Sequence, residues 1–144
     1  VLAQGDSDKT QLLARFKRAR RGILFATATF WEGIDLPGDE LRLLIITRLP
    51  FAVPTEPVTA ARAEAIERRG GRAFDEYSVP EAVLRLRQGF GRLIRKKTDR
   101  GVAAVLDSRI ITKPYGRVML ESLPPARRFY SFQAEALAAY MAGP

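Results

Sequence analysis

Three side chains near the middle of the sequence have the types and the spacing to bind a phosphate group. Gln88, Arg92 and Arg95 are separated by four and three positions, which places them on one face of a helix. Arginine can hold two phosphate oxygens at once through its planar, permanently charged guanidinium group. Arg85 lies on the same face, and the opposite face is apolar, with Val83, Leu86, Phe90, Leu93 and Ile94.

Two glycines, Gly89 and Gly91, lie inside the same predicted helix. Glycine in a helix interior costs roughly 0.5–1 kcal/mol relative to alanine, so these positions are expected to meet a requirement other than helix stability. The alternative for the whole pattern is an ordinary amphipathic helix whose basic face is only solvated.

A second polar segment follows the apolar run 23–26, which is typical of a buried strand. Its sequence from Thr27 to Gly38 is T-A-T-F-W-E-G-I-D-L-P-G, a threonine- and glycine-rich loop ending in Pro-Gly. Ligands of open α/β sheets bind just beyond the carboxyl ends of strands, where this loop would lie. Gly33 allows close backbone approach, and Asp35 supplies an acceptor. The alternative is a structural turn with an Asx cap and Trp31 folded into the core.

Together the two segments resemble motifs V and VI of superfamily 2 helicases, in particular the DinG/XPD-like branch. F-W-E-G-I-D-L-P-G matches motif V, and Q-G-F-G-R-L-I-R matches motif VI as an instance of Q-x-x-G-R-x-x-R. Three further stretches occur in the order of that family, L-I-I-T-R-L-P-F at 44–51, L-D-S-R at 106–109 and T-K-P-Y-G at 112–116. The resemblance covers residues 24–124 and implies the second, C-terminal RecA-like motor domain of a DNA helicase.

The resemblance implies an ATP site shared between two motor domains. Arg92 and Arg95 would reach across the cleft to the γ-phosphate, and Gln88 would sense that phosphate or the attacking water. Asp35 would bind the nucleotide or hold an arginine. The residues that the resemblance assigns to nucleotide binding are Gly33, Asp35 and Gly91. Mg²⁺ and most of the nucleotide would be held by the first motor domain, and an iron–sulfur cluster, where the family has one, would lie elsewhere in the full-length protein.

The resemblance also implies a single strand of DNA as partner. Thr27, Thr29 and Arg48 are the candidates for sequence-independent contacts to its backbone, contacts that would weaken with salt. For Arg48 the alternative is a cap on the end of a strand. The second partner is the first RecA-like motor domain of the same protein.

Composition agrees with a polyanionic partner. The chain has 144 residues, 47% of them hydrophobic, and a formal net charge of +8, which favours nucleic acid over a membrane surface. It contains no cysteine and no histidine, so disulfides, thiolate or zinc sites and Ser/His/Asp or Cys/His catalysis are excluded. No apolar stretch of 18 residues and no signal peptide is present, which predicts a cytoplasmic protein without a membrane segment.

The motifs of a first motor domain are absent from the sequence. There is no G-x-x-x-x-G-K-[ST] phosphate loop, and an Asp-Glu-x-His box is impossible without histidine. The most similar sequence, Asp75-Glu76-Tyr77-Ser78, is expected in a polar loop. Residues 1–144 are therefore interpreted as one domain, an excised piece that begins after motif IV and lacks the first strand of its sheet. We expect this piece alone to be inactive as an ATPase.

Periodicity predicts an α/β fold, a RecA-like parallel sheet with helices on both faces. A helix capped by Ser7 is expected to run to Arg18, and another helix spans 58–69 before the Gly70-Gly71 break. Ser78 and Glu81 are expected to form a capping box for the arginine-bearing helix, with Pro80 in its first turn. The tail 132–141 is also predicted to be helical. The expected strands are 1–4, 23–26, 41–49 and 102–106.

Two other functions remain open on the sequence alone. One is a nucleic-acid-binding module without enzymatic activity, although such a module has no need for a carboxylate beside an arginine pair. The other is the helicase-like half of a DinG-type exonuclease. If the motor interpretation is right, Arg92 and Arg95 project toward the open surface onto which the Asp35 loop leads, at the carboxyl end of the sheet.

Overall fold

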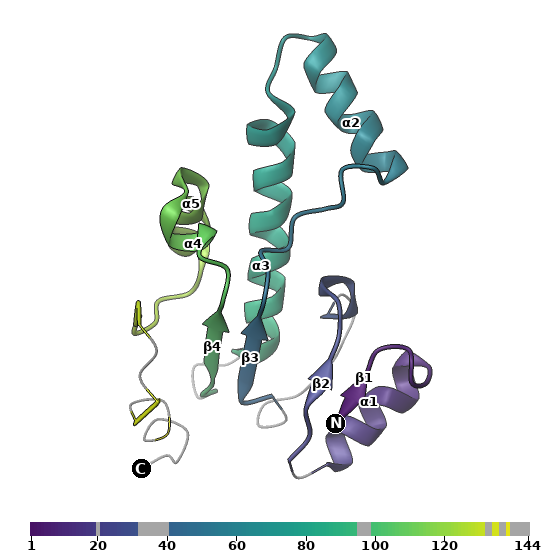
Figure 1. The fold of residues 1–144 in the computed structure, drawn as a ribbon, viewed down its shortest axis with the longest axis vertical. Helices are drawn as coiled ribbons and strands as arrows, with labels where there is room; N and C mark the ends of the chain where they lie inside the picture. Colours follow the sequence, from purple (N-terminus) through teal and green to yellow (C-terminus); the bar gives the residue numbers. More distant parts are fainter. Residues whose placement is uncertain (20, 32–40, 95–98, 132–133, 136–137, 139–144) are drawn as a thin grey trace.

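The computed structural model describes residues 1–19, 21–31, 41–94, 99–131, 134–135 and 138, with only the backbone of Thr29 (Figure 1). Strands and helices alternate along the chain, which confirms the predicted α/β class. The elements in order are β1 (Leu2–Ala3), α1 (Lys9–Arg18), β2 (Leu24–Phe25), the 3-10 helix η1 (Ala28–Trp31), β3 (Leu43–Ile46), α2 (Pro57–Arg68), the π-helix η3 (Phe74–Ser78), α3 (Val79–Leu93), β4 (Val102–Val105), α4 (Arg109–Thr112) and α5 (Pro114–Ser122).

The described strands form two parallel pairs, and each pair is joined through helices. β1 pairs with β2, with Leu2 opposite Leu24, and α1 connects them. β3 pairs with β4 from Leu43 opposite Val102 to Ile46 opposite Val105. A long connection through α2, η3 and α3 separates these two strands in the sequence, as parallel pairing requires. The four strands follow one another across Figure 1 in the order β4, β3, β2, β1.

The first helix begins one residue later than predicted. The Asp8 carboxylate, rather than the Ser7 hydroxyl, accepts the backbone N–H groups of Thr10 and Gln11, at 2.9 and 3.0 Å. The negative charge of a carboxylate at this position is also stabilised by the positive end of the helix dipole. Gly5, with φ of 106°, makes the preceding turn, a conformation that side-chain-bearing residues rarely adopt.

The predicted capping box at the start of α3 is wrong. Ser78 already has helical backbone angles and makes no capping hydrogen bond, because η3 runs directly into α3. The stretch from Asp75 to Ser78 is therefore part of a π-helix and not a polar loop. Pro80 lies in the first turn, as expected. The buried positions of α3 recur every three or four residues, at Val79, Ala82, Leu86, Gly89 and Leu93.

Two apolar clusters form the core. The larger lies between α3, the β3–β4 pair, α4 and α5, and consists of Ile46, Leu49, Ala82, Leu86, Ile110 and Met119. The smaller lies between α1, β1 and η1, and consists of Leu2, Leu12 and Phe30. Trp31 packs against both clusters.

Side chains of β3 alternate between two faces. Ile46, which faces α3, is 3% exposed, whereas Leu43 and Ile45 on the opposite face are 38% and 53% exposed. Within the described residues, α3 is thus the helix that covers this strand pair. Figure 1 shows α2 standing away from the sheets and α4 and α5 beyond the carboxyl end of β4.

Candidate functional site

The last two turns of α3 carry the glutamine, the glycines and the first of the two arginines that the sequence singled out. Gln88 and Gly91 are exposed, Gly89 belongs to the buried stripe, and Arg92 is half-buried. The helix ends at Leu93, so Arg92 lies in its final turn.

Arg92 is bound to the segment that follows β2. Its Nε atom donates a hydrogen bond of 3.1 Å to the backbone carbonyl of Trp31, the last residue of η1. Trp31 lies 61 positions earlier in the sequence, so this bond joins the two predicted motifs in space. A guanidinium group has five N–H donors, and one bond from Nε leaves the terminal nitrogens able to bind an anion.

Gly89 explains how the two segments approach each other. A Cβ atom built on Gly89 would lie 3.3 Å from each of three atoms of the Trp31 indole ring. The absence of a side chain at this position therefore lets the ring lie directly against the backbone of α3. The first of the two helix glycines thus serves packing between the motifs.

Gly91 has a different environment. A Cβ atom built on it meets no described atom within 4 Å, so packing among the described residues gives no reason for a glycine at this position. The resemblance assigns Gly91 to nucleotide binding, and this assignment stays a prediction.

The described part of the proposed DNA path consists of Thr27 and Arg48. The backbone N–H and the hydroxyl of Thr27 are 2.9 and 3.0 Å from the same atom, Oε1 of Gln4. Gln4, at the end of β1, was not identified from the sequence because it lies 23 positions away. Arg48 is exposed just beyond the carboxyl end of β3.

Three predicted site residues, Gly33, Asp35 and Arg95, lie outside the described residues, as does the Thr29 side chain. The expected convergence of Arg92 and Arg95 on the surface beside Asp35 therefore stays a prediction.

The sequence alone assigned no role to the ion pair between Asp107 and Arg109, which lies at the carboxyl ends of β3 and β4. The Asp107 carboxylate, only 8% exposed, accepts the backbone N–H of Leu49 at 2.9 Å and binds the Arg109 guanidinium through a contact of 2.6 Å. Arg109 in turn lies over the Phe51 ring, 5.7 Å from its centre. Because Leu49 follows β3 and Asp107 follows β4, the pair ties together the carboxyl ends of both strands.

The ion pair between Asp107 and Arg109 shifts the pKa values of both groups. The hydrogen bond from Arg109 holds the pKa of Asp107 well below its usual range, with further help from the two backbone N–H donors. The same interaction raises the pKa of Arg109. The only sequence signal was the L-D-S-R stretch at 106–109, which gives the residue types but not their partner on the neighbouring strand.

The described residues include no group of three or more acidic, histidine or cysteine side chains that could hold a metal ion. In the same part of the chain, no helix has the length and apolar character needed to cross a membrane.

Comparison with known proteins gives a consistent result. Residues 1–126 match the family described as helicase C-terminal domain. The chain is 51% identical over 128 residues to the ATP-dependent DNA helicase YoaA of Escherichia coli, covering 89% of this chain and 20% of that protein. It is 48% identical over 136 residues to the ATP-dependent DNA helicase DinG of Photobacterium profundum, covering 92% and 20%. It is 44% identical over 145 residues to the 3'-5' exonuclease DinG of Bacillus subtilis, covering 99% and 16%. The chain therefore spans about a fifth or less of these relatives.

Proposed function

Because this chain belongs to the family of helicase C-terminal domains, we propose that it is the second motor domain of an ATP-dependent DNA helicase of the DinG type. The observation that carries the proposal is the contact between its two motifs. The hydrogen bond from Arg92 to Trp31, with the ring of Trp31 against Gly89, brings α3 to η1, which precedes Asp35 in the sequence.

The donor set at the end of α3 fits the phosphates of a nucleotide. Phosphate oxygens are acceptors, and the amide of Gln88 and the terminal nitrogens of Arg92 can donate to them. At Gly91 a phosphate group can approach the backbone because no described atom occupies that space. Arg95 would supply the second guanidinium group, and Asp35 would hold the nucleotide or orient an arginine.

The chain's own part in the reaction is to place positive charge. Bound ATP with Mg²⁺ would supply the phosphoryl group, and the resemblance assigns the metal to the first motor domain. Arg92 and Arg95 would stabilise the charge that develops at the γ-phosphate, a contribution worth roughly 10³–10⁵ in rate for a well-placed arginine. Gln88 would orient the attacking water.

DNA contact in this proposal rests mainly on Arg48. Because the backbone N–H and the hydroxyl of Thr27 both lie against Gln4, Thr27 orders the start of the loop, and a phosphate would have to compete with Gln4 for its donors. Arg48 presents an exposed charge at the carboxyl end of β3, where a strand lying across both motor domains would pass. The Thr29 side chain would contribute from within the same loop as Thr27.

The test uses the whole protein that carries this chain. Arg92→Ala should lower DNA-stimulated phosphate release by at least about 10³-fold, and Arg92→Lys should restore little because an ammonium group cannot reproduce the planar fork. Arg68→Ala is the matched control, since Arg68 is 72% exposed and pairs with Glu64 on α2. Turnover that survives Arg92→Ala at saturating DNA would refute the proposed role, and turnover by the isolated 144-residue chain would refute the half-motor assignment.

A second candidate, the helicase-like half of a DinG-type exonuclease, is favoured by the relative in Bacillus subtilis that is named as one. The same full-length protein would be incubated with end-labelled DNA, with and without ATP. Shortening of the labelled strand without unwinding would favour the exonuclease, and ATP-dependent strand separation would favour the helicase. Absence of both activities and of ATP turnover would leave the non-enzymatic binding module.

A further inference from the structure

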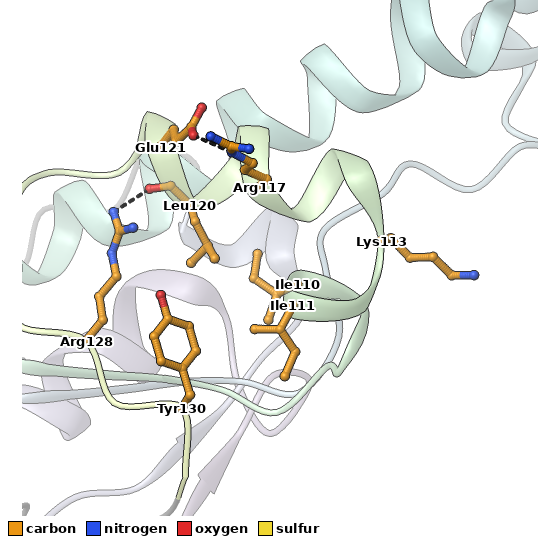
Figure 2. A pocket seen from close by; sticks show the side chains of 8 residues that line it. All are labelled: Ile110, Ile111, Lys113, Arg117, Leu120, Glu121, Arg128 and Tyr130. Carbon is orange, nitrogen blue, oxygen red and sulfur yellow. Dashed lines mark hydrogen bonds and ion pairs between the residues drawn. The ribbon is translucent and has the colours of Figure 1, made fainter.

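A groove separate from the α3 site lies between α4, α5 and the segment that follows α5. It has a volume of about 360 Å³, and Figure 2 shows the eight side chains that line it. Nothing in the helicase motifs assigns a role to this surface. The lining residues are Ile110, Ile111, Lys113, Arg117, Leu120, Glu121, Arg128 and Tyr130.

The inside of the groove suits a flat apolar ring. The side chains of Ile111 and Leu120 face the ring of Tyr130 across the opening (Figure 2). Tyr130 is 68% exposed, so most of its ring is available to another molecule. The volume lies near the lower end of the range for small-molecule sites, roughly 300–1,000 Å³, and admits about one nucleotide.

The rim of the groove carries the guanidinium group of Arg128 and the ion pair between Arg117 and Glu121. The Nη2 atom of Arg128 donates a hydrogen bond of 2.7 Å to the Leu120 carbonyl, which holds the segment after α5 against the helix. The other N–H groups of that guanidinium can still bind an anion. Arg117 shares its charge with Glu121, at 2.8 Å. Lys113 points away from the groove at its edge (Figure 2).

The basic and aromatic character continues along the chain next to the groove. The Arg127 guanidinium lies 4.9 Å from the centre of the Phe129 ring, and Phe129 is 48% exposed. Exposed aromatic rings beside arginines are the combination by which proteins hold single-stranded nucleic acids, with bases stacked on the rings and phosphates on the cations. A duplex cannot present its bases in this way, because they are stacked and paired.

We propose that this groove binds one nucleotide of a single-stranded nucleic acid, with the base on Tyr130 and a flanking phosphate on Arg128. This contact needs neither ATP nor the arginines of the α3 site. It would give the strand a second point of attachment, on α4, α5 and the segment that follows α5.

The test measures binding of fluorescent oligo-dT to the full-length protein without nucleotide. Tyr130→Ala should weaken binding by roughly 5- to 150-fold, the usual effect of losing one stacked base, whereas Tyr130→Phe keeps the ring and should bind normally. Arg128→Ala should also lower the magnitude of the salt slope by about 0.7, as expected for one phosphate contact on a single strand.

Arg68→Ala on α2 controls for a general loss of positive charge. Equal affinities of Tyr130→Ala and the unchanged protein for oligo-dT would overturn the proposal. The proposal would also be overturned if Tyr130→Ala weakened binding of free dTMP or of an acidic peptide but left binding of the oligonucleotide unchanged. A defect in binding with normal ATP turnover at saturating DNA would support it, and this result is independent of the outcome for Arg92.

Discussion

Replacing Gly89 by alanine tests the junction between the two motifs. The added Cβ atom would lie 3.3 Å from Trp31 ring atoms, closer than the 3.5–4.0 Å of a comfortable carbon contact, so the ring must move by a few tenths of an ångström. Alanine in a helix interior gains about 1 kcal/mol over glycine, and overpacking typically costs about 1–3 kcal/mol. We therefore expect the free energy of unfolding to fall by about 0–2 kcal/mol.

The effect on activity should exceed the effect on stability. Displacement of Trp31 moves the carbonyl that accepts the hydrogen bond from Arg92, so the arginine loses its orientation while the fold persists. Stability would be measured by urea unfolding of the 144-residue chain, in which Trp31 is the only tryptophan and its fluorescence reports directly on this contact. Turnover would be measured in the full-length protein.

A stability gain of about 1 kcal/mol, the full helix-propensity difference, together with unchanged tryptophan emission would refute this reasoning. It would mean that the ring of Trp31 does not lie against α3 in solution. Loss of turnover with normal emission would place the role of Gly89 elsewhere than in packing against Trp31.

Three further predictions use other residues. Gly91→Ala meets no described atom, so it should raise the free energy of unfolding by about 0.5–1 kcal/mol while lowering ATP turnover, as measured by urea unfolding and phosphate release. Asp107→Asn should lower the free energy of unfolding by about 1–2 kcal/mol, a modest value because Arg109 is 43% exposed to solvent. Folding lowers the pKa of Asp107, so the contribution of this carboxylate to stability is fully present above about pH 4 and is lost as the pH falls, which urea unfolding at several pH values would measure. In the full-length protein Arg95→Ala should abolish turnover with DNA affinity kept, whereas Arg48→Ala should weaken DNA binding and flatten its salt dependence.

The sequence predicted the order of the elements well, because strand runs and helix periodicity are local signals. It failed at the start of α3, where the capping box was expected. Phe74 packs against Phe51 and Tyr115, with ring centres 5.7 and 5.4 Å apart, and these contacts accompany a helical backbone before Ser78. A motif of four adjacent residues carries no information about such distant partners.

In the candidate site too, local spacing was predicted from the sequence, whereas contacts between distant residues were not. Motif spacing identified Gln88 and Arg92 on one helix, and the family and its DinG relatives confirm the resemblance on which their roles rest. The contact of Arg92 with Trp31 spans 61 positions, and that of Asp107 with Leu49 spans 58. Neither pair has a fixed spacing that a single sequence could reveal, so only the folded chain identifies them.

The position of Trp31 has a consequence for how the two candidate sites communicate. η1 begins directly after Thr27, at the start of the proposed DNA loop, and ends at the residue whose carbonyl holds Arg92. A chain of contacts alone does not transmit a change; the linking element must move as a unit between two arrangements. We predict that η1 is such an element, because the ring of Trp31 packs against both core clusters and against Gly89 and so couples η1 to the carbonyl that holds Arg92. A shift of η1 caused by a bound strand would therefore displace Arg92 as well, and the Gly89→Ala variant should weaken the stimulation of ATP turnover by DNA more than it weakens DNA binding.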